Sequence, residues 1–156
     1  MVFLESIANF LLFLHLCATI VLAGSMGHNL VLVVRYCRGN FTKQKVEKLY
    51  VRIAFWAYCV TFLLGALVYP TFRIRVRAEY LDEMRPAVTG LFEVKEHWAS
   101  IGLALILAYY VLSKYLHPSV QRNRLLFLYV PLCFILNIVV LYLIYAGFYI
   151  TTVKGI

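Results

Sequence analysis

FLLFLHLCATIVLAGSMGHNLVLVV, the stretch from Phe10 to Val34, decides the fold class of this chain. It runs for 25 residues without an Asp, Glu, Lys or Arg. A helix needs about 20 apolar residues to cross about 30 Å of hydrocarbon. Backbone groups in lipid must also satisfy one another within the segment, which a helix does. The stretch therefore predicts a membrane-spanning helix.

Three further runs have the same character. They cover residues 53–72, 98–113 and 125–153, and the whole chain is 63% hydrophobic but only 14% charged. A soluble domain of 156 residues cannot bury that much apolar surface. The third run extends backwards to Pro86, a residue that suits a first helical position, with Glu93 and Glu96 in its early turns. We expect an all-α integral membrane four-helix bundle, a single domain over 1–156 with spans at about 5–36, 50–72, 86–116 and 124–152.

The charged residues are divided unevenly between the two sides that four spans create. One side carries nine basic residues against one acid, and the other carries six basic residues with six of the seven acids. The basic loop 37–49 is therefore expected in the cytoplasm, with both termini and the loop 73–85 outside, in a bacterial inner membrane. The net charge of +8 indicates contact with anionic lipid headgroups, and nucleic acid is not expected as a partner. The nine basic residues of the predicted cytoplasmic side are Arg35, Arg38, Lys43, Lys45, Lys48, Arg52, Lys114, Arg122 and Arg124.

Motifs for hydrolysis, nucleotide binding or structural zinc are absent from the sequence. No phosphate-binding loop or Ser-His-Asp set is present, and the four cysteines are scattered without a CxxC spacing. The most polar stretch, FRIRVRAEYLDEMRP, begins at Phe72. Arg73, Arg75 and Arg77 alternate there with apolar residues, which predicts a short extended or interfacial connector. The three arginines either bind headgroups or face acidic groups of a cofactor, such as haem propionates.

The stretch LFEVKEHW, from Leu91 to Trp98, places charges and a histidine directly before an apolar run. His97 lies about 13 Å inward from Val88, and His15 of the first span lies about 12 Å inward from Ile7. Two histidines at similar depth on different helices are what a bis-histidine haem b requires. We therefore take His15 and His97 as candidate ligands of a haem iron. Glu93 would orient the His97 imidazole, and Lys95 would join the three arginines near the propionates.

Other roles for these residues remain open. Either histidine would also serve as a structural residue that hydrogen-bonds a neighbouring helix. Glu93, Glu96, His97 and Arg85 could instead form a site for quinone or proton transfer. A second haem between His28 and His117 is disfavoured, because the spacing is about 30 Å from His97 to His117 but about 20 Å from His15 to His28.

The four-span layout and the two histidines resemble small four-helix membrane cytochromes of the b type, such as cytochrome b561-like proteins and the membrane anchors of respiratory enzymes. The chain departs from the paired-histidine spacing of di-haem members. The resemblance implies an electron-transfer subunit that carries electrons between quinone and an outer-side partner within a larger complex. The alternative is a cofactor-free accessory subunit of a multi-subunit membrane complex. Either role differs from that of a stand-alone enzyme.

Overall fold

The structure, a computed structural model, describes residues 4–117 and 125–155, and these ranges contain helices and no strand. A short 3-10 turn, Glu5–Ile7, precedes the first helix. The helices are α1 (Ala8–Cys37), α2 (Gln44–Phe72), a π-helical segment (Arg73–Leu81), α3 (Asp82–Met84), α4 (Pro86–Tyr115) and α5 (Leu125–Val153). Four of the helical stretches are long and apolar enough to cross a membrane, as the sequence predicts.

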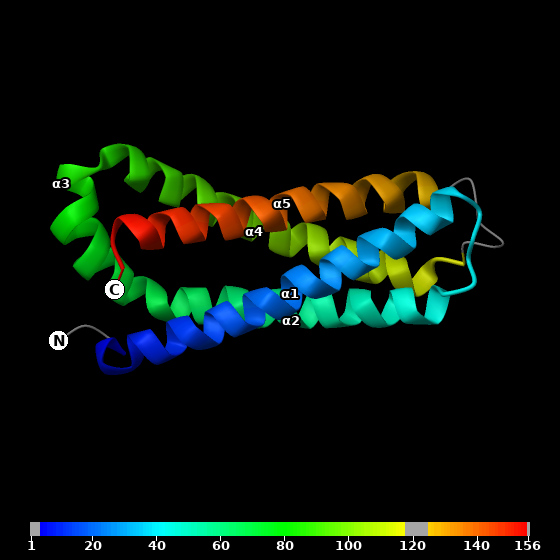
Figure 1. Ribbon diagram of the computed structural model, residues 1–156, viewed down its shortest axis with the longest axis horizontal. Helices are drawn as coiled ribbons and strands as arrows, with labels where there is room; N and C mark the ends of the chain where they lie inside the picture. Colours follow the sequence, from blue (N-terminus) through cyan, green and yellow to red (C-terminus); the bar gives the residue numbers. More distant parts are fainter. Residues whose placement is uncertain (1–3, 118–124, 156) are drawn as a thin grey trace.

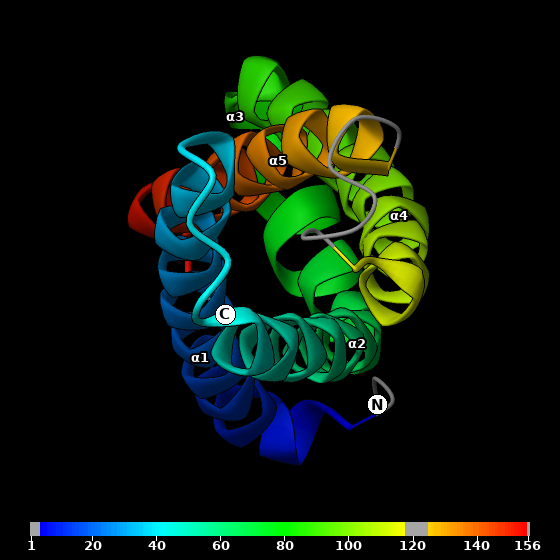
Figure 2. The same cartoon turned by 90° about the vertical axis from the view of Figure 1, so that its right-hand side faces the viewer.

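The four long helices run alternately up and down and form a closed ring. Each packs against two neighbours, in the order α1, α2, α4, α5 and back to α1. In the end-on view, α1 lies opposite α4 and α2 lies opposite α5 (Figure 2). The start of α1, the end of α5 and α3 lie at one end of the bundle, which we call the terminal end (Figure 1). The start of α2 and the end of α4 lie at the other, the loop end.

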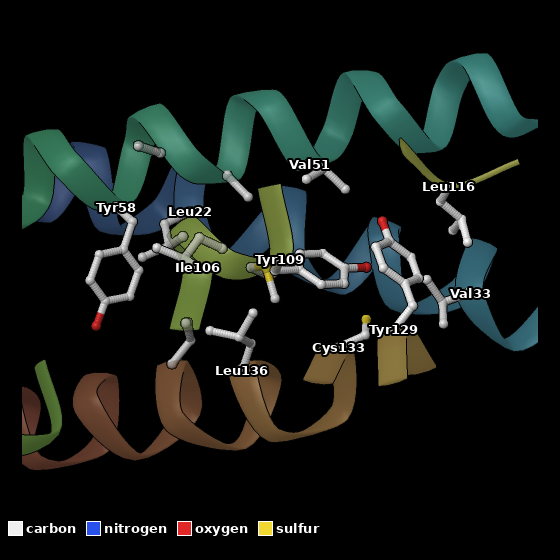
Figure 3. Close-up of a cluster of buried hydrophobic side chains, with 14 of the residues drawn as sticks. Leu22, Val33, Val51, Tyr58, Ile106, Tyr109, Leu116, Tyr129, Cys133 and Leu136 are labelled. Carbon is white, nitrogen blue, oxygen red and sulfur yellow. The ribbon is translucent and has the colours of Figure 1, made fainter. Parts of the chain in front are cut away.

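Two apolar clusters hold the bundle together. The larger one extends from the middle of the bundle to the loop end and includes Val33, Val51, Ile106 and Leu136, each almost completely buried (Figure 3). The smaller one lies at the terminal end around Val76, Leu81, Val88, Phe92 and Ile150. Many other large apolar side chains are exposed on the outside of the ring, as expected for helices that face lipid.

The close contact between α2 and α4 depends on a glycine. The hydroxyl group of Tyr58 donates a hydrogen bond of 2.9 Å to the carbonyl oxygen of Ala99, so that the Tyr58 ring lies directly against Gly102. A Cβ at Gly102 would overlap the Tyr58 hydroxyl and lie 3.2 Å from Cγ1 of Val139. The glycine thus allows an aromatic side chain to bridge two spans.

The segment after α2 differs from the expected connector. Residues 73–84 continue the helix, first in π-helical and then in α-helical geometry. No glycine or proline occurs between Thr71 and Met84 to stop it. The break comes at Arg85, with φ −145° and ψ 59°, because a residue before proline is disfavoured in the α conformation. The alternation of Arg73, Arg75 and Arg77 with apolar residues predicted an extended connector. Three alternating positions are too few to indicate a strand where no residue stops the helix.

The basic loop is also shorter than the range 37–49. Helix α2 begins at Gln44, so Lys45, Glu47 and Lys48 belong to its first turns. The charged residues predicted a loop, but they lie in the first turns of α2, and Glu47 packs into the bundle there. Arg122 and Arg124, which also entered the charge count, lie outside the described residues.

Candidate functional site

A cavity of about 700 Å³ lies between the four long helices in the terminal half of the bundle. All four helices contribute to its walls, which are mainly apolar and aromatic. Its size falls within the usual range for pockets that bind small molecules or cofactors. The polar residues that line the cavity are Asn9, His15, Thr19, Tyr58, Thr61, Tyr69, Lys95, Glu96, Ser100, Thr151 and Lys154.

His15 is the polar group in the cavity whose geometry is most clearly defined. It is half-buried, and its Nδ1 atom lies 2.9 Å from the carbonyl oxygen of Thr61 on α2. A carbonyl oxygen only accepts, so Nδ1 carries the proton and Nε2 is available to another partner. Gly65 makes room for the ring, since a Cβ at that position would lie 3.3 Å from Cε1 of His15. The chain therefore fixes both the orientation and the tautomer of this imidazole.

Lys95 brings a positive charge into the same cavity. Its ammonium group lies 5.8 Å from the centroid of the Phe92 ring, a cation–π contact, and its aliphatic chain runs beside Gly147 of α5. It is near enough to His15 to act on it electrostatically. None of the ion pairs among the described residues includes Lys95. The ammonium group is thus placed to interact with an acidic or carbonyl group in the cavity.

His97 does not share this cavity. It is exposed, and its Nδ1 atom lies 2.7 Å from the carbonyl oxygen of Glu93 on the same helix. His97 follows Lys95 by two residues, about 200° around the helix axis, so a face that presents Lys95 to the cavity turns His97 away. His15 lines the cavity, and His97 is not among its lining residues. Within residues 4–117 and 125–155, no group of three or more His, Cys, Asp or Glu side chains is arranged to hold a metal ion.

The predicted arginines lie at the terminal end, outside the cavity. Arg77 forms ion pairs with Glu93 at 2.6 Å and with Asp82 at 3.4 Å. The Glu93 carboxylate therefore faces Arg77, and its backbone carbonyl is what contacts His97. Of the cations considered for a haem propionate, Lys95 is the one that lines the cavity.

The other two arginines have different surroundings. Arg75 pairs with Glu5 at 2.7 Å and with Glu79 at 3.0 Å. Arg73 is exposed and borders a small cleft with Tyr69 and Asp82. All three arginines thus lie on the surface of the helical segment at the terminal end, where Arg75 and Arg77 form ion pairs.

The second pair of histidines is not assembled either. His28 is exposed, donates from Nδ1 to the carbonyl oxygen of Gly24 at 2.7 Å, and stacks on Tyr50. His117 is exposed beyond the end of α4. These contacts are local, and they give His28 a structural role in the α1–α2 contact.

Sequence reasoning missed a polar cluster at the loop end, which we call the Glu47 cluster. It consists of Asn29 and Tyr36 from α1, Glu47 from α2, Tyr109 from α4, and Tyr129 and Cys133 from α5, all buried. Two signals were present in the sequence. Asn29 is an amide inside a membrane span, and Glu47 is a single acid among basic residues.

Comparison of the chain with protein-family models, with curated proteins and with solved structures gives no match. The resemblance to b-type cytochromes thus stays a prediction from the span layout and the histidines. The geometry of the cavity and of the Glu47 cluster is the basis for the functional proposals that follow.

Proposed function

We propose that the chain is an integral membrane subunit that binds a quinone in its cavity and serves electron transfer within a larger complex. The observation that carries this proposal is the placement of His15, whose Nδ1 is held by the Thr61 carbonyl while the ring borders the cavity. Histidines that bind a ligand or metal through one ring nitrogen are commonly fixed in this way through the other.

The cavity matches the two parts of a quinone. Its apolar walls suit a ring and an isoprenoid tail, which enter from the lipid without leaving an apolar environment. Nε2 of His15 would accept a hydrogen bond from a quinol hydroxyl, and Lys95 would donate one to a quinone carbonyl. A partner subunit would supply two electrons, and two protons would then complete the quinol. Glu96, which also borders the cavity, is a candidate to deliver one of them.

The donors in the cavity do not match a bis-histidine haem b, the cofactor first expected. The cavity offers His15, and His97 lies elsewhere. A haem in this space would have a single imidazole ligand and Lys95 as its nearby cation. A quinone needs no second histidine, which is why we favour it.

The charge distribution supports an orientation for this role. With the basic loop end in the cytoplasm and both chain ends outside, the cavity would occupy the outer half of the bilayer. A quinone there would exchange electrons with a partner on the outer side, as the sequence suggested. Large exposed apolar residues on α5, such as Phe127 and Phe148, offer a surface for lipid or for other membrane subunits.

The first experiment combines lipid extraction with visible spectroscopy on the purified protein. Wild type is expected to retain quinone in chromatographic analysis of the extract, and His15→Ala is expected to lose most of it. His97→Ala is the matched control, since its ring lies outside the cavity. A b-type haem spectrum in the reduced-minus-oxidised difference would overturn the choice of quinone. A colourless, quinone-free protein would favour the cofactor-free accessory subunit.

A further inference from the structure

The buried acid at the loop end has surroundings of its own, independent of the cavity. Glu47 lies in the first turn of α2 and has no solvent exposure. Its carboxyl group is enclosed by side chains from α1, α4 and α5 (Figure 3 shows Tyr109, Tyr129 and Cys133). A carboxylate removed from water in this way is very unfavourable unless a cation or several donors compensate it.

Within residues 4–117 and 125–155, no cation forms an ion pair with the carboxyl group of Glu47. The ion pairs among the described residues all lie at the terminal end and involve Arg75 or Arg77. Its basic neighbour Lys48 acts on it electrostatically but forms no ion pair with it. The other titratable groups that face it are the uncharged side chains Tyr36, Tyr109, Tyr129 and Cys133.

The hydrogen bonds to Glu47 are unevenly divided between its two oxygens. Oε1 accepts a hydrogen bond of 3.0 Å from Nδ2 of Asn29 and another from the hydroxyl group of Tyr129. Oε2 is buried and accepts none from the described residues. An ionised carboxylate has two equivalent oxygens and attracts donors to both. A carboxylic acid has a carbonyl oxygen that accepts and a hydroxyl oxygen that donates, so an accepting Oε1 beside an Oε2 that accepts nothing fits the acid better.

The side chain of Asn29 is fixed in the orientation that this pattern needs. Its Oδ1 atom accepts hydrogen bonds from the Tyr109 hydroxyl at 2.6 Å and from the Cys133 thiol at 3.3 Å. Its amide nitrogen must then point at Glu47. The hydroxyl hydrogens of Tyr109 and Tyr129 are both used, so neither is available to Oε2.

The hydroxyl group of Tyr36 interacts with the same carboxyl group. It is buried, and neither it nor Oε2 has a hydrogen-bond partner of ordinary length and angle within the described part of the chain. A single hydrogen bond between Oε2 and this hydroxyl would give both buried atoms a partner. Donation by Tyr36 to an ionised Glu47 would leave a buried negative charge with no ion-pair partner among the described residues, whereas a proton on Oε2 supplies the partner and removes the charge.

We propose that the Glu47 cluster is a proton-binding site, in which Oε2 of Glu47 holds a proton at neutral pH and presents it to the Tyr36 hydroxyl. The ligand of this site is the proton itself. Phe41, from the 38–43 connection, packs on the Tyr36 ring with 5.4 Å between the ring centroids. Release of the proton would leave a buried charge without an ion-pair partner among the described residues, so release requires water or a cation to reach Glu47.

The test is infrared spectroscopy of the purified wild-type protein at pH 7, in the region of the carbonyl stretch of protonated carboxylic acids. Exposed carboxyl groups ionise near pH 4 and leave this region empty. We expect a band in wild type that is lost in Glu47→Gln and shifted in Tyr36→Phe, whereas any band from the half-buried cavity acid Glu96 stays unchanged in both variants. Gln keeps an accepting oxygen for Asn29 and Tyr129 and offers an N–H to Tyr36, so this variant imitates the protonated acid.

Three results would overturn the proposal. Wild type could show no such band at pH 7, which would mean an ionised Glu47 stabilised by water or by a bound cation. The band could persist in Glu47→Gln, which would assign it to another acid. If Glu47→Gln does not fold, Tyr36→Phe still decides, because an unshifted band excludes a proton shared between Glu47 and Tyr36. None of these readouts depends on quinone, so the result is independent of the cavity proposal.

Discussion

The two ends of the bundle differ in how their buried polar groups are hydrogen-bonded. At the loop end, side chains from all four long helices meet around Glu47, and all but two of their polar atoms are hydrogen-bonded to one another. At the terminal end, His15 and Lys95 are half-buried beside a cavity of about 700 Å³. Polar groups that satisfy one another accept nothing larger than a proton, whereas unsatisfied groups beside an apolar space are available to a ligand. Stability is therefore expected to depend on the loop end, and ligand binding on the terminal end.

Removal of Asn29 should have the largest effect on stability. Asn29→Ala leaves the Tyr109 hydroxyl and the Cys133 thiol without their acceptor and removes one of the two donors to Oε1 of Glu47. Each unsatisfied buried group costs about 1–3 kcal/mol, so we expect a loss of at least about 2 kcal/mol in the free energy of unfolding, followed by thermal denaturation in detergent. Asn137→Ala is the matched control, because the Asn137 amide bonds the backbone of its own helix at 2.9 Å. Similar losses in both variants would contradict a special role for the loop end.

A methyl group at Gly102 should have the next largest effect. Gly102→Ala places Cβ against the Tyr58 hydroxyl and near Val139, and overpacking of this kind costs about 1–3 kcal/mol. The melting temperature should fall, and the Tyr58 hydrogen bond to Ala99 should be lost. Gly27→Ala in α1 is the control, since a Cβ there meets nothing within 4 Å, and a helical Gly→Ala exchange in open space stabilises by about 0.5–1 kcal/mol. Equal behaviour of the two variants would show that α2 and α4 are not packed this closely.

The helices themselves could be predicted from the sequence because span length and apolar composition are set by the thickness of a bilayer. The rotation of each helix about its axis could not. Counting residues gave His15 and His97 similar depths, but only packing decides that Lys95 faces the cavity and His97 faces outward. The Glu47 cluster was missed for a related reason. A charged first turn suggests a solvated loop, and nothing in the local sequence tells which side chain points inward.

The terminal end can be tested without touching a polar group. Gly65→Ala puts a Cβ 3.3 Å from Cε1 of His15, so the imidazole must shift by a few tenths of an ångström. We expect stability to change little and quinone retention to fall about threefold to tenfold, equivalent to about 1 kcal/mol of binding free energy. Gly90→Ala in α4 is the control, since its Cβ would meet nothing within 4 Å. Unchanged quinone content in Gly65→Ala would argue against His15 as the binding residue.

The smallest effect is expected from the ion pair between Arg77 and Glu93, which joins the π-helical segment to α4 at 2.6 Å. The Glu93 side chain is 49% exposed, and exposed pairs contribute about 0–1 kcal/mol. Glu93→Gln should therefore lower the melting temperature slightly, and less at high salt. It should also leave quinone retention unchanged, because His97 contacts the backbone of Glu93 and not its carboxylate. A large loss of bound quinone in Glu93→Gln would return the binding site to the His97 face, where the sequence alone first placed it.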